Sequence, residues 1–172
     1  SPGEKTLLDE VSFSAGRVAT APRTTTAPVI DGDLSDAVWQ SVGGETVPSY
    51  GSFFVLQKGT PAQFETTFRM LHDGERLYVA ARCLQTKEDY YVSSSGRDGR
   101  VWSDDSVEFL LNAPTATEAR DYFQVILNSQ EQPNIFDMWQ GDAEWNGEIE
   151  SAAVRTPGEG WTIEFSIPLA PM

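Results

Sequence analysis

The chain has 172 residues, of which 40% are hydrophobic and 11% aromatic, and this composition suits one globular domain with its own core. Its formal net charge of −14 leaves no basic surface for the phosphates of nucleic acid or for an anionic membrane, so we expect neither partner. No apolar run approaches membrane-spanning length, and we therefore expect no membrane insertion.

Residues 1–27 are polar and show no sustained period, which predicts an extended N-terminal lead-in. Only Val11, Phe13 and Val18 could support a short strand there. The segment has neither the basic start nor the apolar core of a signal peptide, although a cleaved signal would leave no trace. The folded domain is predicted over residues 28–172.

The first strong local signal is the segment 28–39, which contains a turn-forming Asp-Gly pair. Asp33 is placed to cap a short helix, with Asp36 in its first turn, where the helix dipole favours an acidic residue. Trp39 falls on the buried stripe of that helix. At this spacing we expect a core anchor rather than a ligand platform.

Residues 64–83 carry the clearest hairpin pattern, because two β-rich runs flank a second Asp-Gly turn. The preceding residues 43–63 predict a long loop with one short strand at 53–57. The single cysteine, Cys83, cannot form an internal disulfide and is predicted to be a small buried core residue. The single histidine, His72, cannot build a multi-histidine metal site.

The segment 101–111 organises the rest of the prediction. Its apolar residues alternate toward a core, and they are Val107, Phe109 and Leu111. If the extended conformation begins at Trp102, the opposite face carries Trp102, Asp104, Ser106 and Glu108. Such a surface suits a sugar, because the indole ring covers the apolar C–H face of the sugar and the side-chain oxygens accept hydrogen bonds from its hydroxyls. The alternative interpretation is a half-buried strand whose outer face is merely polar.

Further segments alternate in the same way. Over residues 122–128 the predicted core face carries Phe123, Val125 and Leu127, and the opposite face carries Gln124, Ile126 and Asn128. Residues 148–154 and 161–167 predict a final hairpin around a Pro-Gly turn. Many short strands, Gly/Pro loops and short capped helical turns predict an all-β fold, an antiparallel β-sandwich.

Four motifs in sequence order resemble the family 9 carbohydrate-binding modules, which are sandwich folds related to the DOMON-like domains. The motifs are Ile30-Asp31-Gly32 with Asp36 and Trp39; Leu71-His72-Asp73 with Leu77-Tyr78-Val79-Ala80; Trp102 with Asp105-Ser106-Val107-Glu108; and Gly160-Trp161-Thr162-Ile163-Glu164-Phe165-Ser166-Ile167-Pro168. The resemblance implies the sandwich fold over residues 28–168. It says less about function, because folds are reused with altered sites.

The resemblance also implies a site. In this family a sugar is clamped between two tryptophans and hydrogen-bonded by polar side chains. Trp102 matches the first tryptophan and Glu108 the acidic residue six places later, whereas Gln124 and Ile126 stand where the family offers an arginine and an asparagine. The implied carbohydrate-binding residues are Trp102, Glu108, Gln124, Asn128 and Trp139.

The second clamp tryptophan of the family normally lies beyond the Ile-Pro segment, whereas this sequence ends at Met172. Either the chain is a fragment, truncated at the C-terminal end of the module, or another aromatic residue such as Trp139 or Trp145 replaces it. Family members also carry structural calcium, and the resemblance makes Asp105 the first candidate ligand. Calcium needs several oxygen ligands, which one aspartate cannot supply.

The resemblance implies a non-catalytic carbohydrate-binding module of a secreted bacterial polysaccharide-degrading protein, an accessory to a glycoside hydrolase. Its expected partners are a glycan, such as the end of a glucan or xylan chain, and other domains of the parent protein. The expected location is secreted, periplasmic or at the cell surface.

Three other functions have to be compared with this one. The chain could be a ligand-free DOMON-like structural or interaction domain of a larger outer-membrane or secreted protein. A haem-binding DOMON-type carrier would have to use His72, Met70 or Met138 as axial ligands. A glycosidase would need a carboxylate pair, but Asp104 and Glu108 stand about 13 Å apart along a strand, and we therefore expect no enzyme.

Overall fold

The computed structural model describes residues 19–55, 58–112, 118, 121–139, 142 and 144–170 of the chain. Within these ranges the regular structure is strand, apart from two short 3-10 turns, η1 (Ala37–Trp39) and η2 (Val101–Ser103). None of the described helices is long or apolar enough to cross a membrane. The residues Val11, Phe13 and Val18 lie outside the described ranges, so the strand suggested there stays untested.

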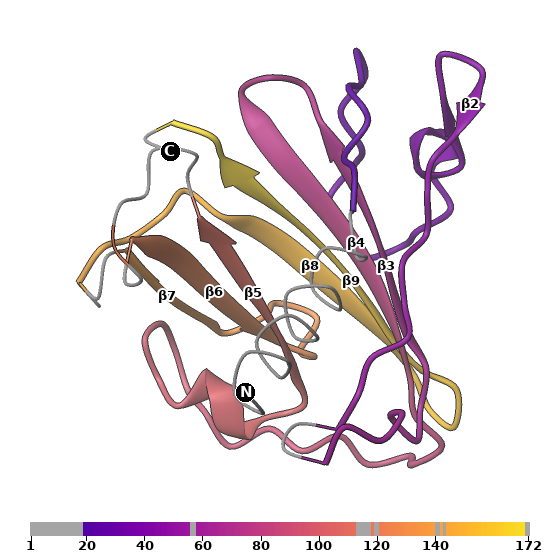
Figure 1. Cartoon of the computed structure of the whole chain (residues 1–172). Coiled ribbons are helices and arrows are strands. Elements are labelled where there is room, and N and C mark those ends of the chain that lie inside the picture. The colour runs from indigo at the N-terminus through magenta and orange to yellow at the C-terminus, as the bar shows by residue number, and fades with distance from the viewer. Residues whose placement is uncertain are drawn as a thin grey trace, which may run out of the picture.

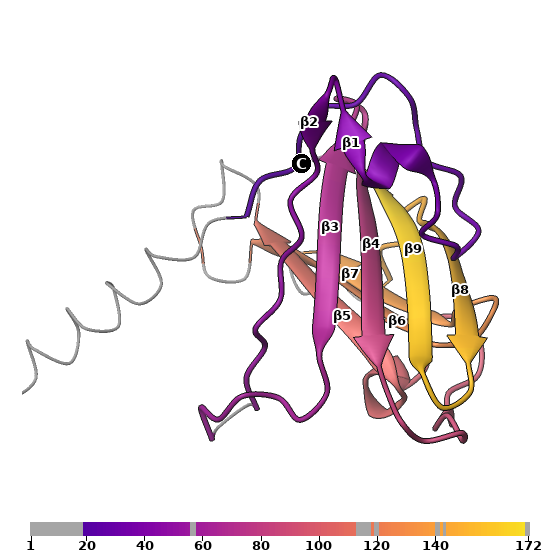
Figure 2. The same cartoon turned by 90° about the vertical axis from the view of Figure 1, so that its right-hand side faces the viewer.

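The strands form three antiparallel sheets (Figures 1 and 2). A small hairpin joins β1 (Ser41–Val42) to β2 (Glu45–Thr46). The four-stranded sheet has the order β3 (Thr66–His72), β4 (Arg76–Leu84), β9 (Gly160–Pro168) and β8 (Glu150–Thr156). The three-stranded sheet has the order β5 (Ser106–Asn112), β6 (Tyr122–Asn128) and β7 (Ile135–Trp139).

The core lies between the four-stranded and the three-stranded sheet, and Figure 2 shows the smaller sheet behind the larger one. Val125 and Leu127 of β6 pack in one cluster with Val79 of β4 and with Ile163 and Phe165 of β9. The predicted antiparallel β-sandwich is therefore confirmed. Apolar side chains from both inner faces interdigitate, and their burial is the main term that holds the sheets together.

The alternation predicted for the two neighbouring strands is also confirmed. The register places the six apolar residues opposite one another as Val107↔Leu127, Phe109↔Val125 and Leu111↔Phe123. The residues of β6 are fully buried, whereas those of β5 are partly buried. The difference follows from position, because β6 is the middle strand and β5 lies at the edge of its sheet.

Both predicted hairpins are present, as β3–β4 and β8–β9. The expected strand at 53–57 reduces to one isolated bridge between Phe54 and Pro61, and residues 56 and 57 lie outside the described ranges. Cys83 is buried, as predicted, and burial raises the pKa of its thiol to about 11. The thiol therefore stays protonated and unreactive at neutral pH.

The outer face of the four-stranded sheet is covered by residues from the segment 29–47. Trp39 and Val47 pack there on Leu71, Tyr78 and Ala80, so the predicted role of Trp39 as a core anchor is confirmed. This cover leaves the outer face of the three-stranded sheet as the less protected side of the sandwich.

The expected helix cap at Asp33 is wrong. The turn η1 begins at Ala37, and neither η1 nor η2 has a side-chain cap. Asp33 instead accepts a 3.1 Å hydrogen bond from the backbone of Ser35, and Asp36 accepts one of 2.8 Å from Val29. Both carboxylates stabilise local turns, because short acidic side chains compete well for nearby backbone donors.

Candidate functional site

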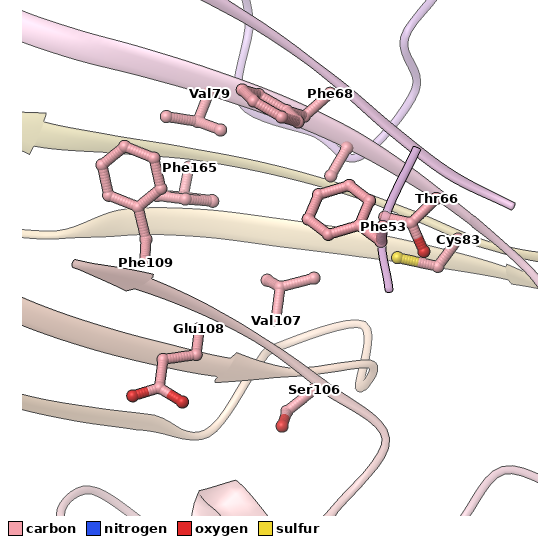
Figure 3. A pocket seen from close by; sticks show the side chains of 11 residues that line it. Phe53, Thr66, Phe68, Val79, Cys83, Ser106, Val107, Glu108, Phe109 and Phe165 are labelled. Atoms are coloured by element: carbon pink, nitrogen blue, oxygen red, sulfur yellow. The ribbon is translucent and has the colours of Figure 1, made fainter. Parts of the chain in front are cut away.

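The outer face of the three-stranded sheet carries the polar set that the sequence predicted. Strand β5 turns its apolar residues inward, and Figure 3 shows Val107 and Phe109 directed toward a cavity between the sheets. Ser106 and Glu108 also border this cavity, but their side chains point the opposite way. The cavity has a volume of about 370 Å³ and is lined largely by apolar side chains, including Phe53 and Phe68.

Trp102 reaches the site by a different route from the predicted one. Its backbone belongs to the turn η2 and not to an extended strand, so simple alternation with Asp104 and Glu108 is wrong. The neighbouring Val101 is fully buried and anchors the turn. The indole remains 51% exposed, as a ligand platform requires.

Phe136 supports this indole, and the sequence analysis did not single it out. The two rings stand edge to face, with centroids 5.3 Å apart and planes at 85°, a geometry that aromatic pairs prefer. In the register Phe136 pairs with Ile126, and Ile126 pairs with Glu108. The alternation of residues 135–139 gave no usable signal for Phe136, because an acidic residue, Asp137, occupies the inward position of β7.

Glu108 and Gln124 form a polar pair on the same face. The amide nitrogen of Gln124 donates to a carboxylate oxygen of Glu108, which is exposed. Gln124 pairs with Leu110, the next residue after Glu108 on the same face of β5, so it is a diagonal neighbour of Glu108. The contact holds the two side chains next to each other. The structure thus brings Trp102, Glu108 and Gln124 to one surface.

Asn128 is on this face of β6 but serves the scaffold. It is fully buried, and its amide nitrogen donates a 3.0 Å hydrogen bond to Asp104. Its carbonyl oxygen accepts a 2.9 Å hydrogen bond from the backbone of Asn134. A side chain whose two ends are occupied in this way cannot also bind a hydroxyl at the surface, so the predicted sugar contact of Asn128 is not supported by its placement.

Asp104 is the centre of that network. One oxygen accepts from the backbone of Ser93 at 2.8 Å and of Ser94 at 3.2 Å, and the other accepts from the hydroxyl of Ser94 and from Asn128. Burial acts to raise the pKa of Asp104, but the hydrogen bonds from Asn128, Ser94 and Ser93 outweigh it and lower the pKa to about 2. The ionised carboxylate therefore stabilises the loop that precedes η2, and η2 is the turn that contains Trp102.

Trp139 lies on the opposite face of the sheet from Trp102. It pairs with Phe123 in the register and stacks on that ring, with centroids 5.4 Å apart and planes at 6°. Trp145 packs edge-on against the same Phe123. Neither tryptophan shares a surface with Trp102, so the structure does not bring Trp139 or Trp145 into a clamp around one sugar ring.

The sequence matches the model of a family described as carbohydrate family 9 binding domain-like, over residues 30–172. The chain belongs to this family. No curated protein matches the sequence. Together with the confirmed sandwich, the match identifies the chain as a family 9 module.

Solved structures resemble the module in fold. A protein of Bacteroides uniformis has a TM-score of 0.63 and 20% identity, covering 89% of this chain and 72% of its own. A family 9 module from Caldicellulosiruptor kristjanssonii solved with cellotriose has a TM-score of 0.61 and 21% identity, covering 87% and 67%. The same organism's family 9 module with glucose has a TM-score of 0.59 and 20% identity, covering 87% and 68%.

Calcium is not supported by the side chains around Asp105. A carboxylate oxygen of Asp105 accepts a 2.9 Å hydrogen bond from the backbone of Tyr91. Among the described residues no three His, Cys, Asp or Glu side chains gather in a group that could hold a metal ion. Since calcium takes six to eight oxygen ligands, Asp105 and its described neighbours do not fit such a site by themselves.

The candidate haem ligands are spread over both sheets. Met70 and His72 belong to β3, whereas Met138 belongs to β7 of the other sheet. Met70 also packs against the sandwich core. Met138 pairs with Gln124 on the outer face of its sheet, so Met70 and Met138 do not face one another across the core.

Proposed function

We propose that this family 9 module is a non-catalytic carbohydrate-binding domain that stacks a sugar ring on Trp102. The main support for this proposal is the half-exposed indole of Trp102, which packs edge to face against Phe136. The polar pair of Glu108 and Gln124 lies on the same face of the sheet. Flat apolar surface and hydroxyl partners thus lie on the same side of the sheet.

The physical basis of the proposal is the two-sided character of a pyranose. Its axial C–H groups form an apolar patch, and covering that patch with the indole of Trp102 releases water at roughly 25 cal/mol per Å² of apolar surface. Glu108 accepts hydrogen bonds from hydroxyls, and Gln124 adds an amide. These groups orient the ring, because a covered hydroxyl without a partner would cost about 1–3 kcal/mol.

The proposed ligand is a chain end of a glucan or xylan. Family membership and the two sugar complexes of the Caldicellulosiruptor kristjanssonii module support this choice. We further propose that the module belongs to a secreted, periplasmic or surface-attached polysaccharide-degrading protein, where it would keep neighbouring domains close to their substrate. Because Trp139 faces the other way, the proposed stack uses one side of the ring within the described structure.

The test compares Trp102→Ala with a matched control in glycan binding. Phe53→Ala is a suitable control, because Phe53 is 46% exposed and contacts Phe68 of the other sheet. Isothermal titration with cellotriose, glucose and xylotriose should show binding by the wild type and by Phe53→Ala, and loss of binding by Trp102→Ala. Unchanged binding by Trp102→Ala, or no binding by the wild-type full-length protein to any of these sugars, would refute the proposal.

One observation favours the interaction-domain alternative. Leu110 is 53% exposed on the outer face of β5 and adds apolar surface to the region. Ile126, on the same face, adds little to this apolar surface, since it is only 2% exposed. The alternative would be established if the protein binds none of the tested sugars but binds another domain of its parent through Leu110.

A further inference from the structure

Two arginines lie side by side on the outer face of the four-stranded sheet, far from the platform of Trp102. Arg69 pairs with Ala80 and Arg82 pairs with Thr67 in the β3–β4 register. Residues in this diagonal relation point to the same side of a sheet and have side chains within reach of one another. Ala80 belongs to the apolar cluster under the segment 29–47, which identifies the side as the outer one.

Both arginine side chains line one cavity of about 270 Å³. Its polar lining consists of donors and neutral groups, with Gln40, Ser49 and Thr67 beside the two guanidinium groups, and it includes no Asp or Glu. This composition is unusual in a chain whose net charge is −14. The volume lies below the roughly 300–1,000 Å³ of sites for drug-sized ligands and suits a small molecule.

Neither arginine has a partner among the described residues. The ion pairs found there join Arg76 to Glu150 and Arg97 to Asp137, and the buried Nε of Arg69 has no hydrogen-bond acceptor. The guanidinium of Arg69 stays charged, so its buried and unpaired Nε costs about 1–3 kcal/mol, whereas Arg82 is exposed to solvent. Such a defect calls for an explanation, and an anion in the cavity supplies one.

Glu164 is on the same face but cannot be the missing partner. It sits diagonally across from Arg82, because Arg82 pairs with Thr162 of β9. Its two carboxylate oxygens accept hydrogen bonds from Trp39, Gly32 and Asp31. Both carboxylate oxygens of Glu164 are therefore already occupied by the segment that covers the sheet.

We propose that the cavity of Arg69 and Arg82 is a second binding site, specific for a sugar that carries a carboxylate, such as a uronic acid. The two guanidinium groups match a planar carboxylate, which they bind through paired, charge-assisted hydrogen bonds. Gln40, Ser49 and Thr67 face the hydroxyls of the ring. The anion also offsets the two positive charges that border this cavity.

The experiment uses the Trp102→Ala protein, so that the platform on the other sheet does not contribute. Sodium glucuronate should bind in isothermal titration at low ionic strength, and more weakly as salt is added, whereas glucose should not bind. Arg82→Gln and Arg69→Gln should each weaken glucuronate binding at least about tenfold. Lys87→Gln, which removes one positive charge from an exposed loop residue, should leave it unchanged.

Three results would overturn the proposal. They are equal binding of glucose and glucuronate, unchanged glucuronate affinity in both arginine variants, and tighter binding of glucose 6-sulfate than of glucuronate. If Arg69→Gln does not fold, the exposed Arg82→Gln decides. Because every protein in the series lacks the indole of Trp102, failure here is distinct from failure of the glycan platform.

Discussion

The indole nitrogen of Trp39 donates a 2.5 Å hydrogen bond to Glu164, a residue 125 positions away in the chain. Glu164 is fully buried in β9, and it also accepts from the backbone nitrogens of Gly32 at 2.8 Å and Asp31 at 3.1 Å. One carboxylate thus joins the covering segment to a middle strand of the larger sheet. The motif residues at both ends of the domain meet at this point.

We predict that Trp39→Phe lowers the free energy of unfolding by the cost of the lost packing plus about 1–3 kcal/mol. The additional loss arises because a buried carboxylate loses a hydrogen-bond donor. Trp161→Phe is the control, since Trp161 is also buried and has no hydrogen bond from its indole among the described contacts. Urea denaturation measures both. Equal losses for the two substitutions would contradict a special role for the Trp39–Glu164 contact.

Gly160→Ala should strongly destabilise the domain. Gly160 has φ of +128°, and a Cβ built there would stand 2.1 Å from the carbonyl oxygen of Cys83. Gly158 in the same turn also has positive φ, at +80°, but open space around its Cβ position. Both changes strain the backbone by about 1–3 kcal/mol, and only Gly160→Ala adds a collision with a neighbouring strand. Thermal unfolding should therefore show a much larger loss for Gly160→Ala than for Gly158→Ala.

The stability of the module should depend on Asp104 at acid pH. Its pKa is lowered from 3.8 to about 2, so the folded state favours the ionised form, and the stabilising contribution is present above pH 3.8. It is lost as the pH falls through the folded value near 2. The difference in Tm between wild type and Asp104→Asn should be largest above pH 4 and shrink toward pH 2. A difference that stays constant across this range would rule out the titration.

Glu108→Ala should weaken binding of the proposed glycan about tenfold, the effect of one lost hydrogen bond to a charged acceptor. Glu108→Gln keeps an acceptor and should weaken binding less. Glu45→Ala, on an exposed residue of β2, is the control and should have no effect. Titration calorimetry with cellotriose distinguishes the three. Because Glu108 is exposed, none of these changes should shift Tm by more than a few degrees.

Calcium remains a prediction from the family resemblance. If an ion binds the folded protein, adding it must raise Tm and a chelator must lower it, because a ligand of the native state alone stabilises that state. Differential scanning calorimetry with EDTA and then with excess calcium measures both changes. An identical Tm under the two conditions would count against calcium, in agreement with the side chains around Asp105.

The features that could be predicted from the sequence are those governed by local pattern. Alternation placed Val125 and Leu127 in the core, and turn-forming residues located both hairpins. Trp102 was placed on the ligand-facing surface, and its side chain is exposed there. The extended backbone predicted at Trp102 was wrong, because the residue lies in a 3-10 turn. Asp104 accepts hydrogen bonds from the backbone of residues 93 and 94, and no local pattern around Trp102 reveals these contacts with a distant loop.

Other site features also depended on contacts that no local pattern reveals. Asp137 occupies an inward position of β7, where burial raises the pKa of its carboxyl, and it is accommodated there by Arg97, 2.6 Å away. An acidic residue in a core position hides the true face of the strand. Without knowledge of the Arg97 pair, the sequence could not show that Trp139 points inward with Asp137 while Phe136 points outward.

The position of β9 in the larger sheet has a consequence for biosynthesis. β4 pairs with β9 along its full length, yet β5, β6, β7 and β8 are synthesised between them. Until residues 160–168 leave the ribosome, β4 has one unpaired edge, and the apolar side chains of Val79 and Ala81 lack their partners from β9. Such an intermediate is prone to aggregation. Expression boundaries placed before Pro168 would make this transient state permanent.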